Sequence, residues 1–437
     1  MFKLFDLSLK LSGFPIEEAK KELSKIISIP EEDYPLYIEN KKKEIVDYHL
    51  KNNPFYKKFL NGKSTNNWED IPIMTKKDVQ LSLTKKLSRG FTSKNVYINK
   101  TSGSSGNPIL FAKDKFSHSL VWANIIRRFG WFDIDFNHSY QARFYGIPLN
   151  KIELFKLRCK DFFANRYRLN IYDLSDEGIK KIIRKFENKK FDYINGYTSS
   201  LVMVAKYLKK NNLKLNIICP SLKVCVVTSE MLFDEDKLLL ETQFGIPITN
   251  EYGASEIEIL AFQNAQNEWL LNTETTFIEI VDDYGKILPN GNEGRIIVTS
   301  LYNLANPFIR YEVGDYGVIA KNSTPKKTIL KKLIGRTNDF AILPSGKKAP
   351  GMTFYSITKK LFDDDGLINE FVIQQIKTDT FNIIYSGKKE FNDQEKSKIT
   401  RVFSDFLEPG LKYEFIKMDK INRNNSGKLK QFVSLLK

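Results

Sequence analysis

The order of strand-like and helix-like segments is the feature that most constrains what this chain can fold into. Between about residue 95 and residue 330, short runs rich in β-branched and aromatic residues alternate with segments whose apolar residues recur at helical spacing. In chain order these segments are NVYINK, FSHSLVWANIIRRFGWF, FDYING, SLVMVAKYLKK, LKVCVVTS and DEDKLLLETQFG. This alternation is typical of an α/β sheet whose strands are joined by helical crossovers. The sequence therefore predicts an α/β fold.

The pattern changes on both sides of this region and indicates two domains. Helical spacing extends over residues 17–51, and residues 269–320 are rich in strand-like alternation. After LIGRTNDF a smaller α/β pattern begins, with INEFVIQQI, FNIIYSG, a lysine-rich helix near 392–407 and YEFIKM. A chain of 437 residues also exceeds what one ordinary core holds. We predict a large α/β N-terminal domain over 1–334, a hinge at 335–339 and a small, mobile α+β C-terminal domain over 340–437.

Composition excludes several classes of protein. The chain is 42% hydrophobic and 13% aromatic, which is enough to bury a core and argues against disorder. Its three cysteines, Cys159, Cys219 and Cys225, form no CxxC pair, so we expect neither a disulfide framework nor a clustered zinc site. No stretch approaches the ~18 consecutive apolar residues of a membrane span, and the N-terminus is a poor signal peptide. We therefore expect a cytoplasmic protein without a membrane span.

The net charge of +16 raises the question of a nucleic-acid partner. The lysines, however, are scattered in pairs and interleaved with acidic residues, and the sequence holds no recognition module or aromatic-basic stripe. We expect no nucleic-acid partner and favour a solvated basic surface that faces small polyanionic molecules.

A loop rich in serine and glycine directly follows NVYINK. It consists of Thr101, Ser102, Gly103, Ser104, Ser105, Gly106, Asn107 and Pro108. The glycines allow the backbone to approach a ligand closely, and the N–H and hydroxyl groups can surround phosphate oxygens. The loop lacks the Gly-Lys-Ser/Thr ending of a Walker loop and is not a GxSxG nucleophile elbow. Taken alone, such a loop is more typical of a flexible turn than of a phosphate site.

Four further segments follow in a fixed order, and the ordered set is more specific than any one member. They are Glu251-Tyr252-Gly253-Ala254-Ser255-Glu256, Tyr311-Glu312-Val313-Gly314-Asp315, Gly335-Arg336-Thr337-Asn338-Asp339 and Arg423-Asn424-Asn425-Ser426-Gly427-Lys428. Together with the serine-glycine loop, this set resembles the adenylate-forming superfamily of acyl-CoA synthetases, peptide-synthetase adenylation domains and luciferases.

Within that superfamily the chain most resembles the phenylacetate–CoA ligase-like family. Asn53-Pro54-Phe55-Tyr56 and the segment WEDIPIMTK at 68–76 are similar to that family's opening. The segments FFANRYRLNIYDLS and INGYTSSL resemble the branch associated with capsular and other surface polysaccharides. The resemblance extends from about residue 45 to residue 431.

The resemblance implies ATP and Mg²⁺ as cofactors and a role for each matching residue. Residues 101–106 would hold the β- and γ-phosphates of ATP. Glu256 would position Mg²⁺, Ser255 would lie beside the α-phosphate, and Lys428 would be the catalytic lysine that bridges the substrate carboxylate and the α-phosphate. The other implied positions are Tyr252 and Gly253 at the adenine ring, Ser229 and Glu230 at its edge, Asp315 and Arg336 at the ribose, and Asn338 at the hinge.

Elementary electrostatics agrees with these roles. A carboxylate that attacks a phosphate meets like-charge repulsion, and the transition state concentrates negative charge on the α-phosphoryl oxygens. A lysine and Mg²⁺ are suitable countercharges and act without proton transfer. The three histidines, His49, His118 and His138, lie outside the segments named above, so no histidine base is required.

Two departures from the family pattern concern the acceptor and the metal. The loop LPSGKKAPGMTFYSI lacks the glutamate that CoA ligases usually carry shortly after its proline. This departure argues against CoA as the acceptor, although a CoA thioester stays an open alternative. Some relatives hold zinc through cysteines after the Tyr-Gly-x-x-Glu segment, but no cysteine follows Cys225 here, so we expect no zinc.

We assign candidate residues to the acyl pocket from the positions of aromatic and polar residues along the chain. Its candidates are Trp131, Phe144, Tyr145, Asn195, Tyr197 and the stretch around 226–229. Arg143, in YQARFYG, could pair with an anionic substrate, but we favour a structural salt bridge for it.

The leading interpretation is an ATP-dependent ligase that activates a carboxylic acid as acyl-AMP and transfers the acyl group to an amine or thiol acceptor, in surface polysaccharide biosynthesis. The first alternative is an acyl-CoA synthetase of the phenylacetate–CoA ligase type. A sugar-nucleotide glycosyltransferase would need an acidic pair, and Asp363-Asp364-Asp365 reads better as a solvated turn. A degenerate nucleotide-binding protein is disfavoured because Lys428, Glu256 and Asp315 are retained. The sequence names neither the acid nor the oligomeric state.

Overall fold

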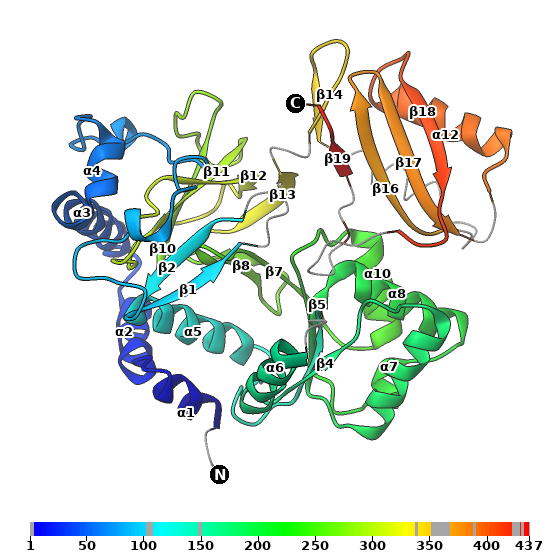
Figure 1. Cartoon of the computed structure of the whole chain (residues 1–437), viewed down its shortest axis with the longest axis horizontal. Helices are drawn as coiled ribbons and strands as arrows, with labels where there is room; N and C mark the ends of the chain where they lie inside the picture. The colour runs from blue at the N-terminus through cyan, green and yellow to red at the C-terminus, as the bar shows by residue number, and fades with distance from the viewer. Residues whose placement is uncertain are drawn as a thin grey trace. The chain divides into compact units, whose positions relative to one another are not determined.

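A computed structural model describes residues 4–101, 108–146, 151–336, 340–350, 368–387, 390–421, 429 and 432–436 (Figure 1). The chain divides into two compact units. The larger unit holds the residues up to Val313 together with Gly317–Lys332, and the smaller unit holds Gly314–Tyr316 and the residues from Leu333 onward.

The larger unit contains a seven-stranded sheet with the order β4-β3-β5-β6-β7-β8-β9. Its strands are β3 (Gln141–Phe144), β4 (Arg166–Leu169), β5 (Tyr193–Tyr197), β6 (Val224–Thr228), β7 (Ile248–Ala254), β8 (Glu258–Gln263) and β9 (Trp269–Leu271). The strands from β4 to β7 pair in parallel, and β8 and β9 pair antiparallel. Parallel neighbours need crossover connections, so the predicted α/β alternation is confirmed.

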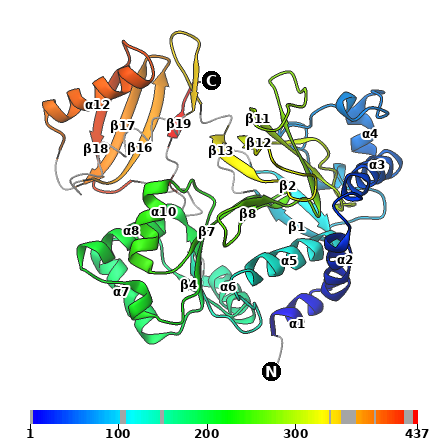
Figure 2. The same cartoon turned by 180° about the vertical axis from the view of Figure 1, so that it is seen from behind.

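Helices cover both faces of this sheet. They are α5 (Lys115–Gly130), α6 (Lys151–Phe163), α7 (Asp176–Asn188), α8 (Thr198–Lys210), α9 (Leu215–Ile218) and α10 (Asp234–Phe244). Figure 2 shows α7, α8 and α10 grouped together, and their apolar residues pack against Phe144, Ile194 and Val227 of the sheet. On the opposite face, Tyr193 and Val226 pack against the apolar side of α5. This division follows from the alternation of side chains along each strand.

The connections leave the neighbouring strands β3 and β5 in opposite directions. β3 leads to β4 on one side, whereas β5 leads to β6 on the other. In open α/β sheets, ligands bind beyond the carboxyl ends of strands at such a topological switch point. The fold therefore predicts a ligand site beyond the ends of β3 and β5.

The N-terminal helices confirm the helical spacing predicted for residues 17–51. They are α1 (Leu4–Leu11), α2 (Ile16–Ser28), α3 (Tyr34–Asn52) and α4 (Pro54–Leu60), followed by the 3₁₀ turns η1 (Trp68–Asp70) and η2 (Leu83–Lys85). Asn53 caps α4, because its side chain accepts a hydrogen bond from the Tyr56 N–H at 2.8 Å. Pro54 stands at the first position of α4, where its missing N–H costs nothing.

Two more sheets follow the strand-rich segments of the sequence. One is the antiparallel pair β1 (Val96–Lys100) and β2 (Leu110–Asp114). The other has the order β10-β11-β12-β13, with β10 (Thr276–Val281), β11 (Glu293–Ser300), β12 (Tyr311–Ile319) and β13 (Leu330–Arg336).

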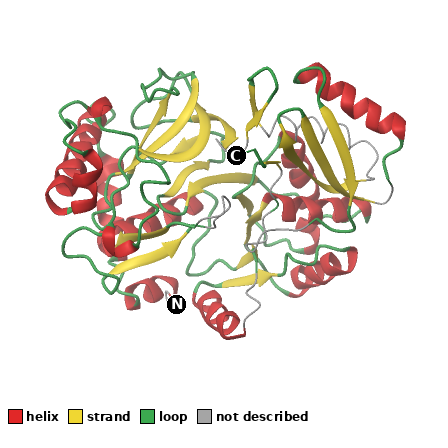
Figure 3. Cartoon of the chain, turned by 45° about the horizontal axis from the view of Figure 1, so that its top comes forward, coloured by secondary structure: helices red, strands yellow, loops and turns green. Residues whose placement is uncertain are grey.

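The smaller unit is an α+β structure with its own core. Its strands are β14 (Phe340–Ile342), β15 (Lys348–Pro350), β16 (Ile368–Lys377), β17 (Thr380–Gly387), β18 (Lys412–Lys417) and β19 (Phe432–Ser434), and its described helix is α12 (Asp393–Phe406). Figure 3 shows the strands of the chain in yellow and its helices in red. The last four strands have the order β18-β17-β16-β19, and Phe403 of α12 packs with Ile373 and Ile383. The predicted α+β pattern after residue 340 is confirmed. Across the described ranges of both units, no helix has the length and apolar character needed to cross a membrane.

Candidate active site

The serine-glycine loop connects the two strands of the β1–β2 pair. Thr101 fastens its base, because the Thr101 N–H donates to the Ile109 carbonyl at 3.0 Å and the Ile109 N–H donates to the Thr101 hydroxyl at 2.9 Å. The chain thus returns on itself between these two residues. Ser102, Gly103, Ser104, Ser105 and Gly106 lie outside the described residues, so their phosphate-binding role stays a prediction.

Tyr311 and Glu256 join two of the sequence segments. The Tyr311 hydroxyl donates to Glu256 Oε1 at 3.0 Å, and both side chains are buried. Tyr311 opens β12, and Glu256 follows the end of β7. The hydrogen bond orients the carboxylate that the resemblance assigns to Mg²⁺.

A buried lysine that the sequence analysis missed contacts the residue before Glu256. Lys113 of β2 donates from Nζ to the Ser255 carbonyl at 3.3 Å. Burial lowers the Lys113 pKa to about 8, against the opposing influence of Glu258 and Glu256. The signal was a lysine directly after the apolar run ILFA, within a strand-like segment. Lys113 brings a positive charge to the turn that carries Ser255 and Glu256.

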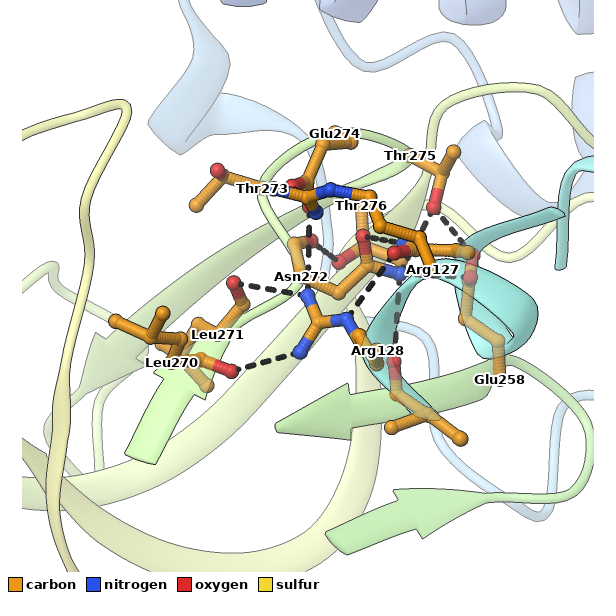
Figure 4. A network of polar contacts seen from close by, with 12 residues as sticks. Arg127, Arg128, Glu258, Leu270, Leu271, Asn272, Thr273, Glu274, Thr275 and Thr276 are labelled. Carbon is orange, nitrogen blue, oxygen red and sulfur yellow. Dashed lines mark hydrogen bonds and ion pairs between the residues drawn. The ribbon is translucent and has the colours of Figure 1, made fainter. Parts of the chain in front are cut away.

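Glu258 belongs to a buried polar network that supports this turn (Figure 4). Its Oε2 accepts from Asn272 Nδ2 at 2.7 Å, and its Oε1 accepts from the Thr275 hydroxyl at 2.9 Å. Burial raises the Glu258 pKa to about 7, opposed by Lys113. Arg128 of α5 donates to the Leu270 and Leu271 carbonyls at 3.0 and 3.3 Å. The network therefore connects α5, β8 and β9 beneath the candidate site.

Tyr252 and Gly253 lie near the end of β7. Tyr252 is buried and meets Trp269 edge-on, with ring centroids 6.2 Å apart. A Cβ atom at Gly253 would approach the Glu258 carbonyl to 2.7 Å, so only glycine fits this close backbone contact. The adenine contact assigned to Tyr252 stays a prediction.

Ser229 and Glu230 follow the carboxyl end of β6. Ser229 has a φ of 69°, in the left-handed region that a non-glycine residue rarely adopts. Glu230 Oε2 accepts from the Ser199 N–H, at the start of α8, at 2.7 Å. The strained turn thereby lies beside the end of β5.

Four predicted substrate-binding residues meet at the switch point of the sheet. Arg143 and Asn195 are partners in the β3–β5 register, and the Tyr145 and Tyr197 rings that follow lie 4.7 Å apart. Asn195 Nδ2 donates to the Val226 carbonyl at 3.2 Å. The carboxyl ends of β3 and β5 therefore present a guanidinium and two aromatic rings at the place where the topology predicts a ligand.

Trp131 has different neighbours. Its ring lies 6.0 Å from that of Phe262, and the guanidinium groups of Arg127 and Arg128 lie 5.5 and 5.6 Å from its centroid. The contacts found in the described part of the chain do not bring it to the Tyr145–Tyr197 pair. Its substrate role stays a prediction.

The structural salt bridge expected for Arg143 is wrong for the described residues, among which it has no ion pair within 4.0 Å. Arg143 instead lies over the Tyr145 ring at 4.1 Å and donates from Nη1 to Gln141 Oε1 at 3.3 Å. The carboxylate of Asp161 is bound instead by Arg166 and Arg168 of β4.

The remaining predicted residues belong to the smaller unit. Asp315 is buried in β12, and Arg336 ends β13. Asn338 and Lys428 fall outside the described residues. The ribose, hinge and catalytic roles of these four residues are predictions.

The residues near Glu256 fit a magnesium ion that binds together with ATP. Mg²⁺ is usually held by one or two carboxylates and by substrate phosphates, rather than by a cage of protein ligands. One carboxylate oriented by Tyr311 meets that requirement. In the described ranges, no group of three or more histidine, cysteine or acidic side chains could hold a metal without a substrate.

Comparison with solved structures identifies the fold. 2-Hydroxyisobutyryl-CoA ligase, in a postadenylation state with R3-HIB-AMP, matches with a TM-score of 0.69 at 14% identity, over 91% of this chain and 88% of that one. The amide bond synthetase McbA of Marinactinospora thermotolerans matches with a TM-score of 0.53 at 13% identity, over 77% of this chain and 69% of that one. The fold is that of the adenylate-forming enzymes.

Comparison with protein sequences narrows the class. The chain is 26% identical to Protein CapK of Staphylococcus aureus over 377 residues, which cover 82% of this chain and 79% of that protein. It is 24% identical to phenylacetate-coenzyme A ligase of Aromatoleum evansii over 254 residues, which cover 56% of each. No family model matches the chain. The chain has the fold of the AMP-forming ligases, and these relatives confirm its resemblance to the phenylacetate–CoA ligase-like family.

Proposed function

We propose that this protein uses ATP to activate a carboxylic acid as its acyl-AMP and then transfers the acyl group to an acceptor. The observation that carries the proposal is the 3.0 Å hydrogen bond from Tyr311 to Glu256. It joins segment 311–315 to segment 251–256, and the family resemblance assigns ATP-binding residues to both. The switch point of the sheet, with Tyr145 and Tyr197, supplies the site for the acid.

In the first step a carboxylate oxygen of the acid attacks the α-phosphorus of ATP. The bond from that phosphorus to the bridging oxygen breaks, and pyrophosphate leaves. Mg²⁺ bound through Glu256 would neutralise charge on the phosphates. Lys113, which contacts the Ser255 carbonyl, would add positive potential near the phosphates. Lys428 would stabilise the charge that develops on the α-phosphoryl oxygens.

In the second step the acceptor attacks the acyl carbon, and AMP leaves. We favour an amine acceptor, because the loop LPSGKKAPGMTFYSI lacks the glutamate usual in CoA ligases. The setting we propose is surface polysaccharide biosynthesis. It rests on the segments FFANRYRLNIYDLS and INGYTSSL and on the similarity to Protein CapK, whose name specifies no substrate. The similarity to phenylacetate-coenzyme A ligase favours CoA as the second candidate.

The test is acid-dependent exchange of labelled pyrophosphate into ATP, with uronic, amino, aryl and fatty acids supplied in turn. An adenylating enzyme exchanges with its own acid, whereas a glycosyltransferase or a degenerate nucleotide-binding protein does not. Absence of exchange with every acid class would reject the proposal.

We predict that Lys428→Ala lowers the exchange rate by on the order of 10²–10³, because it removes one preorganised charge at the α-phosphate. The melting temperature should stay that of the wild type. Lys417→Ala, an exposed lysine of β18, is the matched control and should exchange normally. A normal rate for Lys428→Ala would remove this lysine from the mechanism.

A further inference from the structure

Arg143 occupies the position on β3 from which a side chain reaches the switch point of the sheet. In the register of the parallel strands it lies between Asn195 of β5 and Arg168 of β4. Registered residues of neighbouring strands project from the same face. Arg143 therefore shares a face with Asn195, beside the Tyr145–Tyr197 pair.

The guanidinium of Arg143 has unused hydrogen-bonding capacity. Nη1 donates to Gln141 Oε1 at 3.3 Å, and the group lies over the Tyr145 ring at 4.1 Å. Nε is buried and has no hydrogen-bond partner among the described residues. A buried donor without a partner costs free energy, and a guanidinium offers five N–H groups with a geometry that suits a carboxylate or a phosphate.

The neighbouring strand β4 brings two further arginines close to Arg143. Arg166 and Arg168 of β4 both donate to Asp161 of α6, at 2.5 Å and 3.2 Å for the shorter contacts, so the Asp161 carboxylate is already occupied. Burial and the nearby charge of Arg143 lower the Arg166 pKa to about 10. Arg166 and Arg168 thus share one aspartate, and Arg143 adds a further positive charge near Arg166.

The opposing charge is Glu251 of β7. Its Oε1 accepts from the Thr228 hydroxyl at 2.9 Å, and burial raises its pKa, which disfavours the ionised form. In the described part of the chain, no ion pair joins it to Arg143. Glu251 therefore does not form the ion pair that would neutralise the Arg143 guanidinium.

We propose that Arg143 binds a second anionic group on the acid substrate, a carboxylate or phosphate distinct from the carboxylate that is activated. This inference rests on the proposed adenylation. The activated carboxylate must reach the segment after β7 that carries Ser255 and Glu256, whereas Arg143 lies on β3, three strands away. At a spacing of about 4.8 Å between neighbouring strands, that separation is roughly 14 Å. An extended arginine side chain spans only part of it, so several bonds separate the two anionic groups of the substrate.

The experiment compares acids in matched pairs, in which the second anionic group is the only difference. Succinate is paired with butyrate, glutarate with pentanoate and adipate with hexanoate, and phosphorylated acids form a further arm that separates phosphate from carboxylate. Wild-type enzyme should show a higher kcat/KM in pyrophosphate exchange for the doubly charged member of at least one pair.

Arg143→Gln should lower that preference by about 10- to 100-fold, mainly through the KM for the acid, because a hydrogen bond to a charged group is lost. The KM for ATP and the melting temperature should not change. Arg184→Gln, an exposed arginine on α7, is the matched control and should keep the preference. Arg143→Glu should shift the preference toward the ω-amino acid of the same length.

The outcomes separate this inference from the proposed function. Exchange that proceeds equally with both members of every pair overturns the inference alone. An Arg143→Gln enzyme that keeps the wild-type preference, or that loses affinity for ATP to the same extent, also overturns it. Exchange with no acid at all rejects the adenylation proposal and the inference together.

Discussion

Both ring nitrogens of His49 are satisfied within the protein. Nε2 donates to the Asn303 carbonyl at 3.0 Å, and Nδ1 accepts from the Ser88 hydroxyl at 3.3 Å. This arrangement requires the neutral ring, and burial lowers the His49 pKa to about 4. A charged ring would lose the Ser88 hydrogen bond in a fully buried site.

The protein should therefore lose stability as the pH falls from 6.5 to about 4. In this window the unfolded chain binds a proton at His49, with an ordinary pKa near 6.5, whereas the folded chain does not. The free energy of unfolding should fall by about 2–3 kcal/mol from this group. His118, whose pKa is lowered to about 3 by burial, acts in the same direction. Urea unfolding at pH 7 and pH 4.5 measures the loss.

The comparison variant is His49→Gln. It should be less stable than the wild type at pH 7, because it alters a buried hydrogen-bond network, but should lose less on acidification. An unchanged pH dependence in this variant would show that His49 does not control acid stability.

At the scale of elements, Arg310 fastens the segment 68–71 to the sheet that begins at β10. Its Nη1 donates to the Glu69 and Ile71 carbonyls, both at 2.8 Å, and its Nη2 lies 3.3 Å from Glu279 Oε1. Met74, three residues after Ile71, forms an isolated parallel β-bridge with Tyr311, the residue after Arg310. The segment WEDIPIMTK is thus bound to Arg310 and to Tyr311, the first residue of β12. Tyr311 in turn donates its hydrogen bond to Glu256, so the segment stabilises the strand that orients this carboxylate.

We predict that Arg310→Met lowers the free energy of unfolding by about 3–5 kcal/mol, because Glu279 is left charged, buried and without its partner. The double variant Arg310→Met with Glu279→Met should recover part of the loss. Arg295→Met, which breaks a less buried pair with Glu312, is the control and should cost less. Urea unfolding checks all three, and a double variant less stable than Arg310→Met would contradict this account.

At the scale of the whole molecule, the proposed function leaves the identity of the acceptor to be determined. Lys347 is exposed just before β15, Lys348 is the first residue of that strand, and both belong to the segment LPSGKKAPGMTFYSI, which lacks the usual glutamate. We predict that they dock an anionic amine acceptor, such as a sugar nucleotide, so acceptor turnover should fall as ionic strength rises through physiological values.

The measurement is AMP release from enzyme loaded with acyl-AMP, with CoA or candidate amines added in turn. Amines should accelerate release, and Lys347→Gln should reduce the salt dependence. Fast release with CoA and none with amines would contradict this prediction and indicate an acyl-CoA synthetase.

Local sequence determined much of this architecture. The alternation of segments predicted the α/β sheet, Asn53 and Pro54 specified the start of α4, and the restart of the pattern after residue 340 predicted the α+β unit. These features depend on backbone geometry and on residues within a few positions of one another, so periodicity and capping chemistry report them directly.

Only the tertiary structure decided which side chains meet. Tyr311 reaches Glu256 across 55 positions, Lys113 contacts the Ser255 carbonyl, and Arg143 lies over the Tyr145 ring without an ion pair among the described residues. Periodicity gives the face on which a residue lies, but strand order and packing set the distance between residues on different elements. The sequence therefore named most residues of the candidate site but not Lys113, whereas the strand order decided that three strand spacings separate β3, with Arg143, from β7, after which Glu256 follows.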